Sequence, residues 1–546
     1  MQGNMAKALK YRASKQEYTS QGQLTIPGFE TPFAQHLNPN NRWVVLAAKI
    51  PWDILASVYE QQMRNSQTGA DGINPRVAIG AIIIKHKCDL SDRETVAAIQ
   101  ENVYMQYFIG YSSFSNEEAF DPSLFVDFRK RLGVEQINEI NEKILGLGLS
   151  KDAPGEDKGT TEGGTGNTGV ETVSNTDLCD SVVKRKTEDG TTQQDREQEI
   201  ADNVEHEIID AEQKISDGTK QEVCTNEGQL IVDATACPQD IRYPTDLDLL
   251  NDAREKSEEL IDQLYCPTKH TSKPRTYREI ARKIYLTTAQ KKHKTKKEIR
   301  KAIKRQLNYL KRNIKSIHKL LGTYDSFIPL DRHQYKYLLV IQTFYEQQHE
   351  MFTQNSHQVE HRIVCIHQPH VRPIVRGKTN AKVEFGAKIE VSIMNGFSFL
   401  EELSWEAYNE STRLMNTIEK YKRRFGFYPK EVLVDKIYCT RENRKKLKLL
   451  GIKLRGKPLG RPKAVEAHVR PGERNPIEGK FGQAKSAYGM NRIKARLQQT
   501  SESWIASIVL VLNLVKLAGQ IPFYLLSKIL AQYICCINFN TIVRRT

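Results

Sequence analysis

Several features that would indicate an extracellular or membrane protein are scarce or missing in this chain of 546 residues. Its nine cysteines are scattered and include no C-x-x-C pair, which favours free thiols in a reducing compartment over a disulfide framework. No apolar segment follows the basic N-terminal residues, so we expect no secretory signal. The strongest apolar run, residues 505–515, is shorter than the roughly 20 residues that span a bilayer, and it predicts a buried helix. We therefore expect a cytoplasmic protein with no membrane partner.

Acidic residues are too few to balance the basic ones. The chain has 81 Lys and Arg against 66 Asp and Glu, a formal net charge of +15. With 39% apolar residues and 32 glycines, it can form several folded units and is neither collagen-like nor wholly disordered. A positive balance of this size favours a polyanionic partner, with nucleic acid ahead of a membrane surface.

The charge is unevenly distributed, and the unevenness marks a boundary. Residues 151–220 contain 18 acidic and 8 basic residues, a net charge of −10, so the rest of the chain carries +25. This segment includes the low-complexity run GTTEGGTGNTG at 159–169 and little apolar material that could form a core. We interpret residues 151–227 as a flexible acidic linker, which leaves the positive charge to the parts that fold.

The region before the linker, residues 41–147, is predicted to be a helical N-terminal domain. Residues 76–86 form an apolar helical run, Ser91 with Glu94 is a capping-box pattern, and Asp121-Pro122 is a helix-start pattern. The spacing of these helices fits a DNA-binding helix-turn-helix as well as an ordinary helical bundle. Both interpretations stay open at this point.

The region after the linker alternates between strand and helix patterns. This alternation predicts an α/β domain over residues 228–520, followed by a C-terminal extension at 521–546. A long helical pattern at about 245–355 is expected to be inserted into that domain. The expected strands lie at residues 228–236, 361–366, 382–393, 397–405, 431–438 and 452–457.

The inserted region is strongly basic. Residues 269–319 hold 19 Lys and Arg but only two acids, and apolar residues recur at spacings of three and four along 299–321. The apolar stripe is expected to pack on a partner helix, leaving a basic face outside. That face could simply be solvated, but its charge favours contact with the DNA backbone. We predict DNA contacts from Lys291, Lys292, Lys294, Lys296, Lys297, Arg300, Lys304 and Arg305, and from Arg461 and Lys463 in the segment LGRPK.

Two acids follow apolar strand patterns, and a third lies on a helix. Asp233 is in LIVDAT, Asp435 is in VLVDKI, and Glu478 lies on a helix with Arg474 and Lys485, two cations that we predict to hold DNA phosphates. Carboxylates that converge on divalent cations support phosphoryl transfer on nucleic acids, because the ions activate the attacking oxygen and stabilise the leaving one. Each aspartate could instead end its strand by capping the next helix, and the third acid could belong to a solvated helix.

The blocks LIVDATA, VLVDKIY and RNPIEGKFGQAK, in this order, resemble the three catalytic blocks of insertion-sequence DDE transposases. In that superfamily an Arg lies four residues before the Glu and a Lys seven after it, which Arg474, Glu478 and Lys485 reproduce. The usual Tyr three residues before the Arg is Pro471 here. The segments SDRETVAAIQENVYMQYFIGYSSF and FDPSLFVDFRKRLG are similar to the N-terminal domain of these transposases. QDIRYPTDLDLLNDARE and HQPHVRPIVRGKTNAKVEFGAKIEVS resemble a subgroup with a long helical insertion.

The resemblance implies a fold, a reaction and partners. The fold would be α/β, an RNase H-like mixed sheet flanked by helices and interrupted by the basic helical insertion, after an all-α N-terminal domain. Asp233, Asp435 and Glu478 would bind two Mg²⁺ or Mn²⁺ ions, cut DNA at terminal inverted repeats and join the 3′-OH to target DNA. A homodimer on DNA, associated with a bacterial nucleoid, is expected. Two alternatives remain: a catalytically inactive DNA-binding protein of the same fold, and a nuclease without strand transfer.

Other patterns were weighed against this interpretation. Gly451, Gly456 and Lys457 approach a P-loop, but Pro458 replaces its Ser or Thr, so no nucleotide cofactor is expected. His357, Glu360 and His361 spell an inverted zinc-protease motif, a five-residue match that arises readily by chance. Three further acids follow the first strand but come after polar or turn residues, and we rank them below Asp233 as metal ligands. They are Asp240, Asp246 and Asp248.

Overall fold

The computed structural model describes residue 33 and residues 36–63, 72–145, 226–324, 328–375, 383–456 and 472–519. Several predictions therefore concern positions outside the described residues. These are the linker from 151 to 225, the DNA contacts Arg461 and Lys463, the P-loop-like Lys457 and Pro458, the substituted Pro471, and the extension at 521–546.

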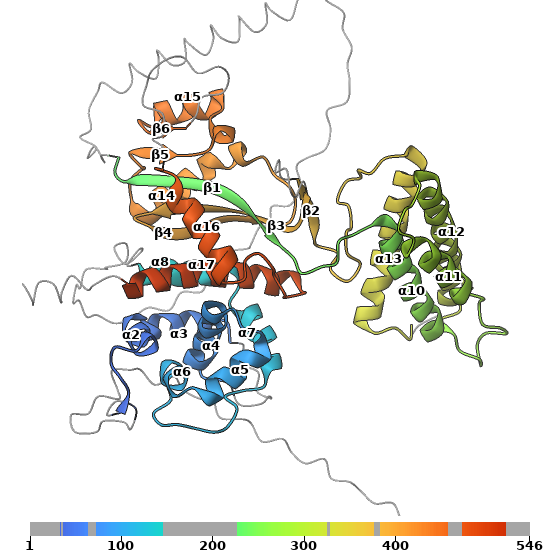
Figure 1. Cartoon of the computed structure of the whole chain (residues 1–546), viewed down its shortest axis with the longest axis horizontal. Coiled ribbons are helices and arrows are strands. Elements are labelled where there is room, and N and C mark those ends of the chain that lie inside the picture. Colours follow the sequence, from blue (N-terminus) through green and yellow to red (C-terminus); the bar gives the residue numbers. More distant parts are fainter. Residues whose placement is uncertain are drawn as a thin grey trace, which may run out of the picture. The chain divides into compact units, whose positions relative to one another are not determined.

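The N-terminal region is helical, as predicted (Figure 1). Ser91 and Glu94 form the expected capping box, and Asp121 accepts a hydrogen bond from the Ser123 amide at 2.8 Å. A cluster of aromatic rings lies inside, with Trp43 and Trp52 each 5.2 Å from Phe108 between ring centroids. The elements are α2 (Arg42–Lys49), α3 (Trp52–Gln61), α4 (Pro75–Cys88), α5 (Asp92–Glu101), α6 (Val103–Phe108), η2 (Pro122–Leu124), α7 (Phe125–Arg131) and α8 (Val134–Ile144).

The later part of the chain forms a mixed sheet, and the predicted α/β class is confirmed. β3 pairs antiparallel with β1 on one side and with β2 and β4 on the other, while β1, β5 and β6 run parallel. The strands are β1 (Gln229–Pro238), β2 (Arg372–Val375), β3 (Val383–Met394), β4 (Phe397–Ser404), β5 (Glu431–Leu433) and β6 (Lys453–Arg455).

Two strand predictions need correction: the strand expected at 431–438 ends at Leu433, and the one expected at 361–366 does not form. Residues 361–366 form turns and bends, although Ile363, Val364 and Ile366 are buried. Ile363 and Ile366 pack into the core of the insertion, whereas Val364 joins a different core. The apolar pattern therefore reflects burial between two clusters without a pairing strand, a case that periodicity alone does not separate from a short strand.

The pairing of the central strands creates a discontinuity in the sheet. β5 pairs with β1 only from Gln229 to Ile231, but β1 continues along β3 as far as Pro238. Asp233 consequently lies inside β1 and does not end the strand to cap a helix, which was the alternative, and Asp435 lies two residues beyond the end of β5. Both aspartates therefore lie just past the point where β5 leaves β1.

The two faces of the sheet are covered by different helices. On one face, Leu230 and Val232 pack with residues of α14 (Leu414–Phe425), η4 (Lys436–Tyr438) and α15 (Arg441–Leu449). On the opposite face, Ile231 packs with Ile477 of α16 (Asn475–Ala487). Since side chains alternate along a strand, Asp233 shares the face of Ile231 and therefore of α16. A short 3₁₀ turn, η3 (Glu410–Thr412), precedes α14.

Helix α17 (Gln498–Gly519) joins the N-terminal helices to the sheet. It contacts α2, α4, α7 and α8 as well as β4, and one hydrophobic core contains residues of all these elements. Asn513 donates hydrogen bonds to Asn141 Oδ1 and to the Ser398 carbonyl, both at 2.7 Å. Among the described helices, α17 alone is long and apolar enough to cross a membrane, but most of it is buried against protein, as predicted for residues 505–515.

The helices of the insertion lie side by side in a bundle (Figure 1). They have a hydrophobic core of their own, which includes Leu250, Leu310 and Phe344. Leu307, Leu310 and Ile317 of the predicted apolar stripe are buried. Arg254 is buried in this region and donates to Glu258 Oε1 at 2.5 Å. The helices are α10 (Asp246–Leu264), α11 (Arg278–Ala289), α12 (Lys296–Leu321) and α13 (Arg332–Gln354).

Candidate active site

Asp233 is held in a largely buried position on β1. Its side chain is 19% exposed, and its Oδ1 accepts a hydrogen bond from the Ala234 amide at 2.9 Å. Burial raises the pKa of this carboxyl above its usual value, although the nearby Arg474 guanidinium acts in the opposite direction. A carboxylate in such a position needs a cation close to it.

Asp435 follows β5, the strand that pairs in parallel with β1. It occupies the N-cap position of η4, where its carbonyl accepts from the Tyr438 amide at 3.1 Å, and its side chain is 55% exposed. Because β1 and β5 are parallel, the chain leaves both strand segments in the same direction. The two aspartates are therefore neighbours in space despite the insertion between them in sequence.

Arg474 bridges the two aspartates. Its Nη2 lies 3.0 Å from Asp233 Oδ2, and its Nη1 lies 3.1 Å from Asp435 Oδ1. The residue is at the N-cap position of α16, and Ile477 anchors the first turn of that helix against the sheet. The planar guanidinium fork suits two carboxylates at once. The two acids thus converge on one shared cation.

Glu478 lies in the first turn of α16, one turn after Arg474, and its side chain is exposed. Lys485 lies in the last turn of the same helix. Within the described ranges, no three His, Cys, Asp or Glu side chains are grouped closely enough to hold a metal ion. The structure thus brings together Asp233, Asp435 and Arg474, but Glu478 does not join the aspartates as a third ligand.

The chemistry of this donor set fits a hard divalent cation. Two carboxylates face the same positive charge, and oxygen ligands are those that Mg²⁺ and Mn²⁺ prefer. By contrast, the three lower-ranked acids each have another partner: Asp240 pairs with Arg492, Asp246 with Arg362, and Asp248 accepts from the Tyr285 hydroxyl.

Two family models match this chain. Residues 432–515, which contain Asp435, Arg474 and Glu478, match the transposase DDE domain, and residues 32–131 match a transposase domain named DUF772. Together these two regions cover less than half of the chain. Both are transposase domains, as the predicted resemblance to DDE transposases expects, and they indicate an insertion-sequence transposase.

The chain is also similar to a curated protein from Rhizobium meliloti. The uncharacterized protein ORF8 in the nfe locus of Rhizobium meliloti is 34% identical over 104 residues, which are 19% of this chain and 49% of the relative. The chain thus spans about half the length of that relative. No solved structure matches.

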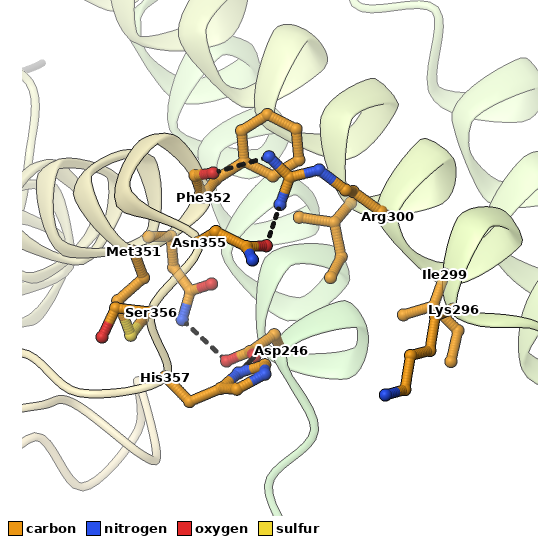
Figure 2. A pocket seen from close by; sticks show the side chains of 11 residues that line it. Asp246, Lys296, Ile299, Arg300, Met351, Phe352, Asn355, Ser356 and His357 are labelled. Atoms are coloured by element: carbon orange, nitrogen blue, oxygen red, sulfur yellow. Dashed lines mark hydrogen bonds and ion pairs between the residues drawn. The ribbon is translucent and has the colours of Figure 1, made fainter.

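Some of the cations predicted to bind DNA already have partners within the protein, whereas others are simply exposed. Lys291 pairs with Glu298, and the Arg300 guanidinium donates to Asn355 Oδ1 at 2.8 Å and lies 4.2 Å from the Phe352 ring centroid (Figure 2). Arg300 and Lys296 also line a cavity of about 390 Å³ between α12 and the end of α13 (Figure 2). The other predicted cations of this region are exposed: Lys292, Lys294, Lys297, Lys304 and Arg305.

Sequence reasoning missed two residues on the sheet face opposite Asp233. Glu390 of β3 is buried, and the Tyr438 hydroxyl donates to its Oε1 at 3.0 Å. The sequence gives no signal for Glu390, because KIEVSI alternates and places this acid with Lys388 and Ser392 on what looks like an exposed polar face. No signal marks Tyr438 either, since a tyrosine after VLVDKI is ordinary core material.

Proposed function

We propose that this transposase cuts DNA at the ends of its insertion sequence and joins the freed 3′-OH to target DNA. The observation that carries the proposal is the shared contact of Asp233 and Asp435 with Arg474. Two acids from separate strands that meet on one cation, one of them with a raised pKa, mark a functional-site candidate. Two element ends must be held together for transposition, so a homodimer on DNA is part of the proposal.

Asp233, Asp435 and Glu478 are the residues that would hold two Mg²⁺ or Mn²⁺ ions. The bound ions supply Lewis-acid activation of water or of a 3′-OH. Asp233 and Asp435 present their carboxylates to Arg474 from neighbouring strands, while Glu478, one helical turn beyond Arg474, would be the third ligand. Once the aspartates bind the ions, the Arg474 guanidinium would be free to hold a DNA phosphate with two parallel hydrogen bonds.

A row of lysines on α12 is the proposed contact with the DNA backbone. The members are exposed and follow one another at spacings of four, three, seven and four, which puts them on one helical face. The row covers about 27 Å of helix, the length of about eight base pairs of duplex. We define the lysine row as Lys297, Lys301, Lys304, Lys311 and Lys315.

Strand cleavage and joining by purified protein test the proposal. A duplex carrying the element's inverted repeat should be nicked in the presence of Mg²⁺, and the new 3′-OH should be found joined to a second duplex. Asp233→Asn, Asp435→Asn and Glu478→Gln should each reduce cleavage at least about a hundredfold, while Asp240→Asn, which lies outside the shared cation contact, retains it.

The alternatives give different results in the same assay. A catalytically inactive DNA-binding protein would bind the inverted repeat without Mg²⁺-dependent nicking in any variant. A nuclease of the same fold would nick the duplex but leave the 3′-OH unjoined. Cleavage that survives all three carboxylate substitutions would refute the assignment of the site.

A further inference from the structure

A carboxylate is buried inside the sheet, directly behind the candidate active site. Glu390 is on β3, its side chain is 1% exposed, and its cross-strand partner on β1 is Ala234, the residue after Asp233. Since neighbouring strand residues point to opposite faces, Glu390 and Asp233 lie on opposite sides of the same ladder. A buried acid is costly unless donors hold it, so its partners are informative.

Two hydroxyl groups hold Glu390. The Tyr438 hydroxyl donates to Oε1 at 3.0 Å, and the Thr417 hydroxyl of α14 donates to Oε2 at 2.8 Å. Tyr438 is fully buried, and burial together with nearby carboxylates raises the pKa of its phenol, so it remains a donor. Each carboxylate oxygen therefore has one donor, and the two donors come from different elements.

Tyr438 belongs to the turn that presents Asp435. Its amide donates to the Asp435 carbonyl at 3.1 Å, and its own carbonyl accepts from Asn443 Nδ2 at 2.9 Å. Its side chain leaves this turn and crosses to β3. The Tyr438–Glu390 hydrogen bond thus connects the Asp435 turn to the strand that pairs with β1 next to Asp233.

This connection matters because β1 does not pair with the backbone at Asp435. β5 contributes only three paired residues to β1 and ends at Leu433, whereas β3 pairs with β1 from Ile231 to Pro238. The backbone bond from the Val434 amide to the Arg455 carbonyl, at 3.1 Å, ties this segment to β6 and not to β1, so the position of Asp435 relative to Asp233 depends on contacts made after β5 has separated from β1. The Tyr438–Glu390 bond is a buried contact of this kind.

We propose that Glu390 is a positioning residue, which acts through Tyr438 to hold Asp435 at the correct distance from Asp233. The proposal rests on the proposed function, because it assigns Asp435 a role in DNA cleavage. Glu390 itself touches neither substrate nor reacting atoms. Its effect is on geometry, and a displacement of about 1 Å at a reacting centre can cost a factor of about a hundred in rate.

The two hydroxyl donors provide a matched pair of variants. Tyr438→Phe removes the bond that leads to the Asp435 turn, while Thr417→Val removes an equally buried bond to the same carboxylate that leads to α14 instead. We expect similar losses of thermal stability in both. Single-turnover DNA cleavage should fall at least about tenfold in Tyr438→Phe and stay within about twofold of the parent in Thr417→Val, with DNA affinity unchanged in both.

Substitutions of Glu390 complete the test. Glu390→Gln keeps an acceptor for Tyr438, so its cleavage rate should stay within about threefold of the parent. Glu390→Ala removes the acceptor, so its cleavage rate should fall as much as in Tyr438→Phe. The double variant of Glu390→Ala and Tyr438→Phe should be no slower than either single variant, because both remove one connection. Equal effects of Tyr438→Phe and Thr417→Val, or additive effects of the two single losses, would overturn the proposal.

Binding of Mn²⁺ alone gives a readout that does not depend on cleavage. Titration of the full chain, followed by electron paramagnetic resonance, should show about fivefold weaker binding in Tyr438→Phe and parental binding in Thr417→Val. Unchanged Mn²⁺ affinity in Tyr438→Phe would contradict the positioning role. If Asp233→Asn abolishes cleavage and Tyr438→Phe does not slow it, only this inference fails. If Asp233→Asn has no effect on cleavage, the proposed function fails as well.

Discussion

Arg474, which lies 241 residues after Asp233 in the chain, donates to Asp233 Oδ2 at a distance of 3.0 Å. The same guanidinium holds Asp435, so in this state a protein side chain supplies the positive charge that two converging carboxylates require. A divalent ion and this arginine would then compete for the same oxygens. The competition leads to the first prediction.

Replacing Arg474 with Gln should increase the affinity of the protein for Mn²⁺ while it lowers DNA cleavage. The substitution removes both ion pairs of Arg474, and Arg474 and Asp233 are largely buried. The carboxylates are then free to bind the metal, and we expect the free energy of Mn²⁺ binding to improve by about 1 kcal/mol, which is about fivefold in the dissociation constant. Isothermal titration with Mn²⁺ measures this change. Arg492→Gln, which removes the same charge from the Asp240 pair, serves as the control and should leave Mn²⁺ binding unaltered.

The lysine row on α12 should dominate the salt dependence of DNA binding. A variant with Lys304, Lys311 and Lys315 changed to Gln should lower the slope of log K against log salt by about three, because each lysine–phosphate contact releases about one counterion. Fluorescence anisotropy with duplex DNA between low and moderate salt gives the slope. The control variant carries Lys130→Gln and Lys446→Gln, which remove lysines already paired with acids. A similar decrease in the slope for this control would argue against the lysine row as a specific DNA-binding surface.

Glu390 should make the stability of the protein depend on pH. Burial raises the pKa of Glu390 from 4.5 to about 7, even though the hydroxyls of Thr417 and Tyr438 act in the opposite direction. The folded state therefore binds more protons than the unfolded state between these values. The contribution to stability is complete below about pH 4.5 and is lost as the pH rises through 7, by about 3 kcal/mol in total.

Urea unfolding at pH 5 and pH 8 measures this effect. The decrease in unfolding free energy between the two pH values should be smaller in Glu390→Gln than in the parent, and Glu442→Gln, at an exposed site, should leave the decrease in place. The charged groups of neighbouring elements also contribute to the local field and must be kept intact in the comparison. They are Lys388, Glu401, Glu402, Glu410 and Arg413.

Asn513 should be critical for the stability of the common core. Its side chain bonds to Asn141, to the Ser398 carbonyl and to the Ser398 amide, so Asn513→Ala leaves several buried polar groups without partners. We expect a loss of about 2–4 kcal/mol in the free energy of unfolding. Ser507→Ala is the matched control on the same helix, because the Ser507 hydroxyl bonds only within α17 to Ser503, and it should cost less than about 1 kcal/mol.

The sequence predicted those features that depend on local patterns. The capping box of Ser91, the start signal at Asp121 and the apolar stripe around Leu310 are encoded within a few residues, and each was found where it was expected. The fold class followed from the alternation of strands and helices. The family followed from three short blocks around Asp233, Asp435 and Glu478.

Features that depend on pairing were beyond the reach of local patterns. Nothing in LIVDATA tells whether a strand ends at Asp233 or continues, because that depends on how far β3 accompanies β1. Residues 361–366 had the composition of a strand but no neighbour with which to pair. The contact of Arg474 with both aspartates, and the bond between Tyr438 and Glu390, follow only from the tertiary arrangement. The functional roles of Asp233, Asp435 and Glu478 stay predictions until the variants are measured.

Helix α17 has a consequence for the decay of mobile elements. It lies near the end of the described chain, yet its residues complete the core of helices that are made first, including α4 and α7. A gene copy with a stop codon before codon 498 would therefore encode N-terminal helices with an exposed apolar surface. An exposed apolar surface of this kind favours aggregation and proteolysis, so we expect no stable fragment made of the N-terminal helices alone.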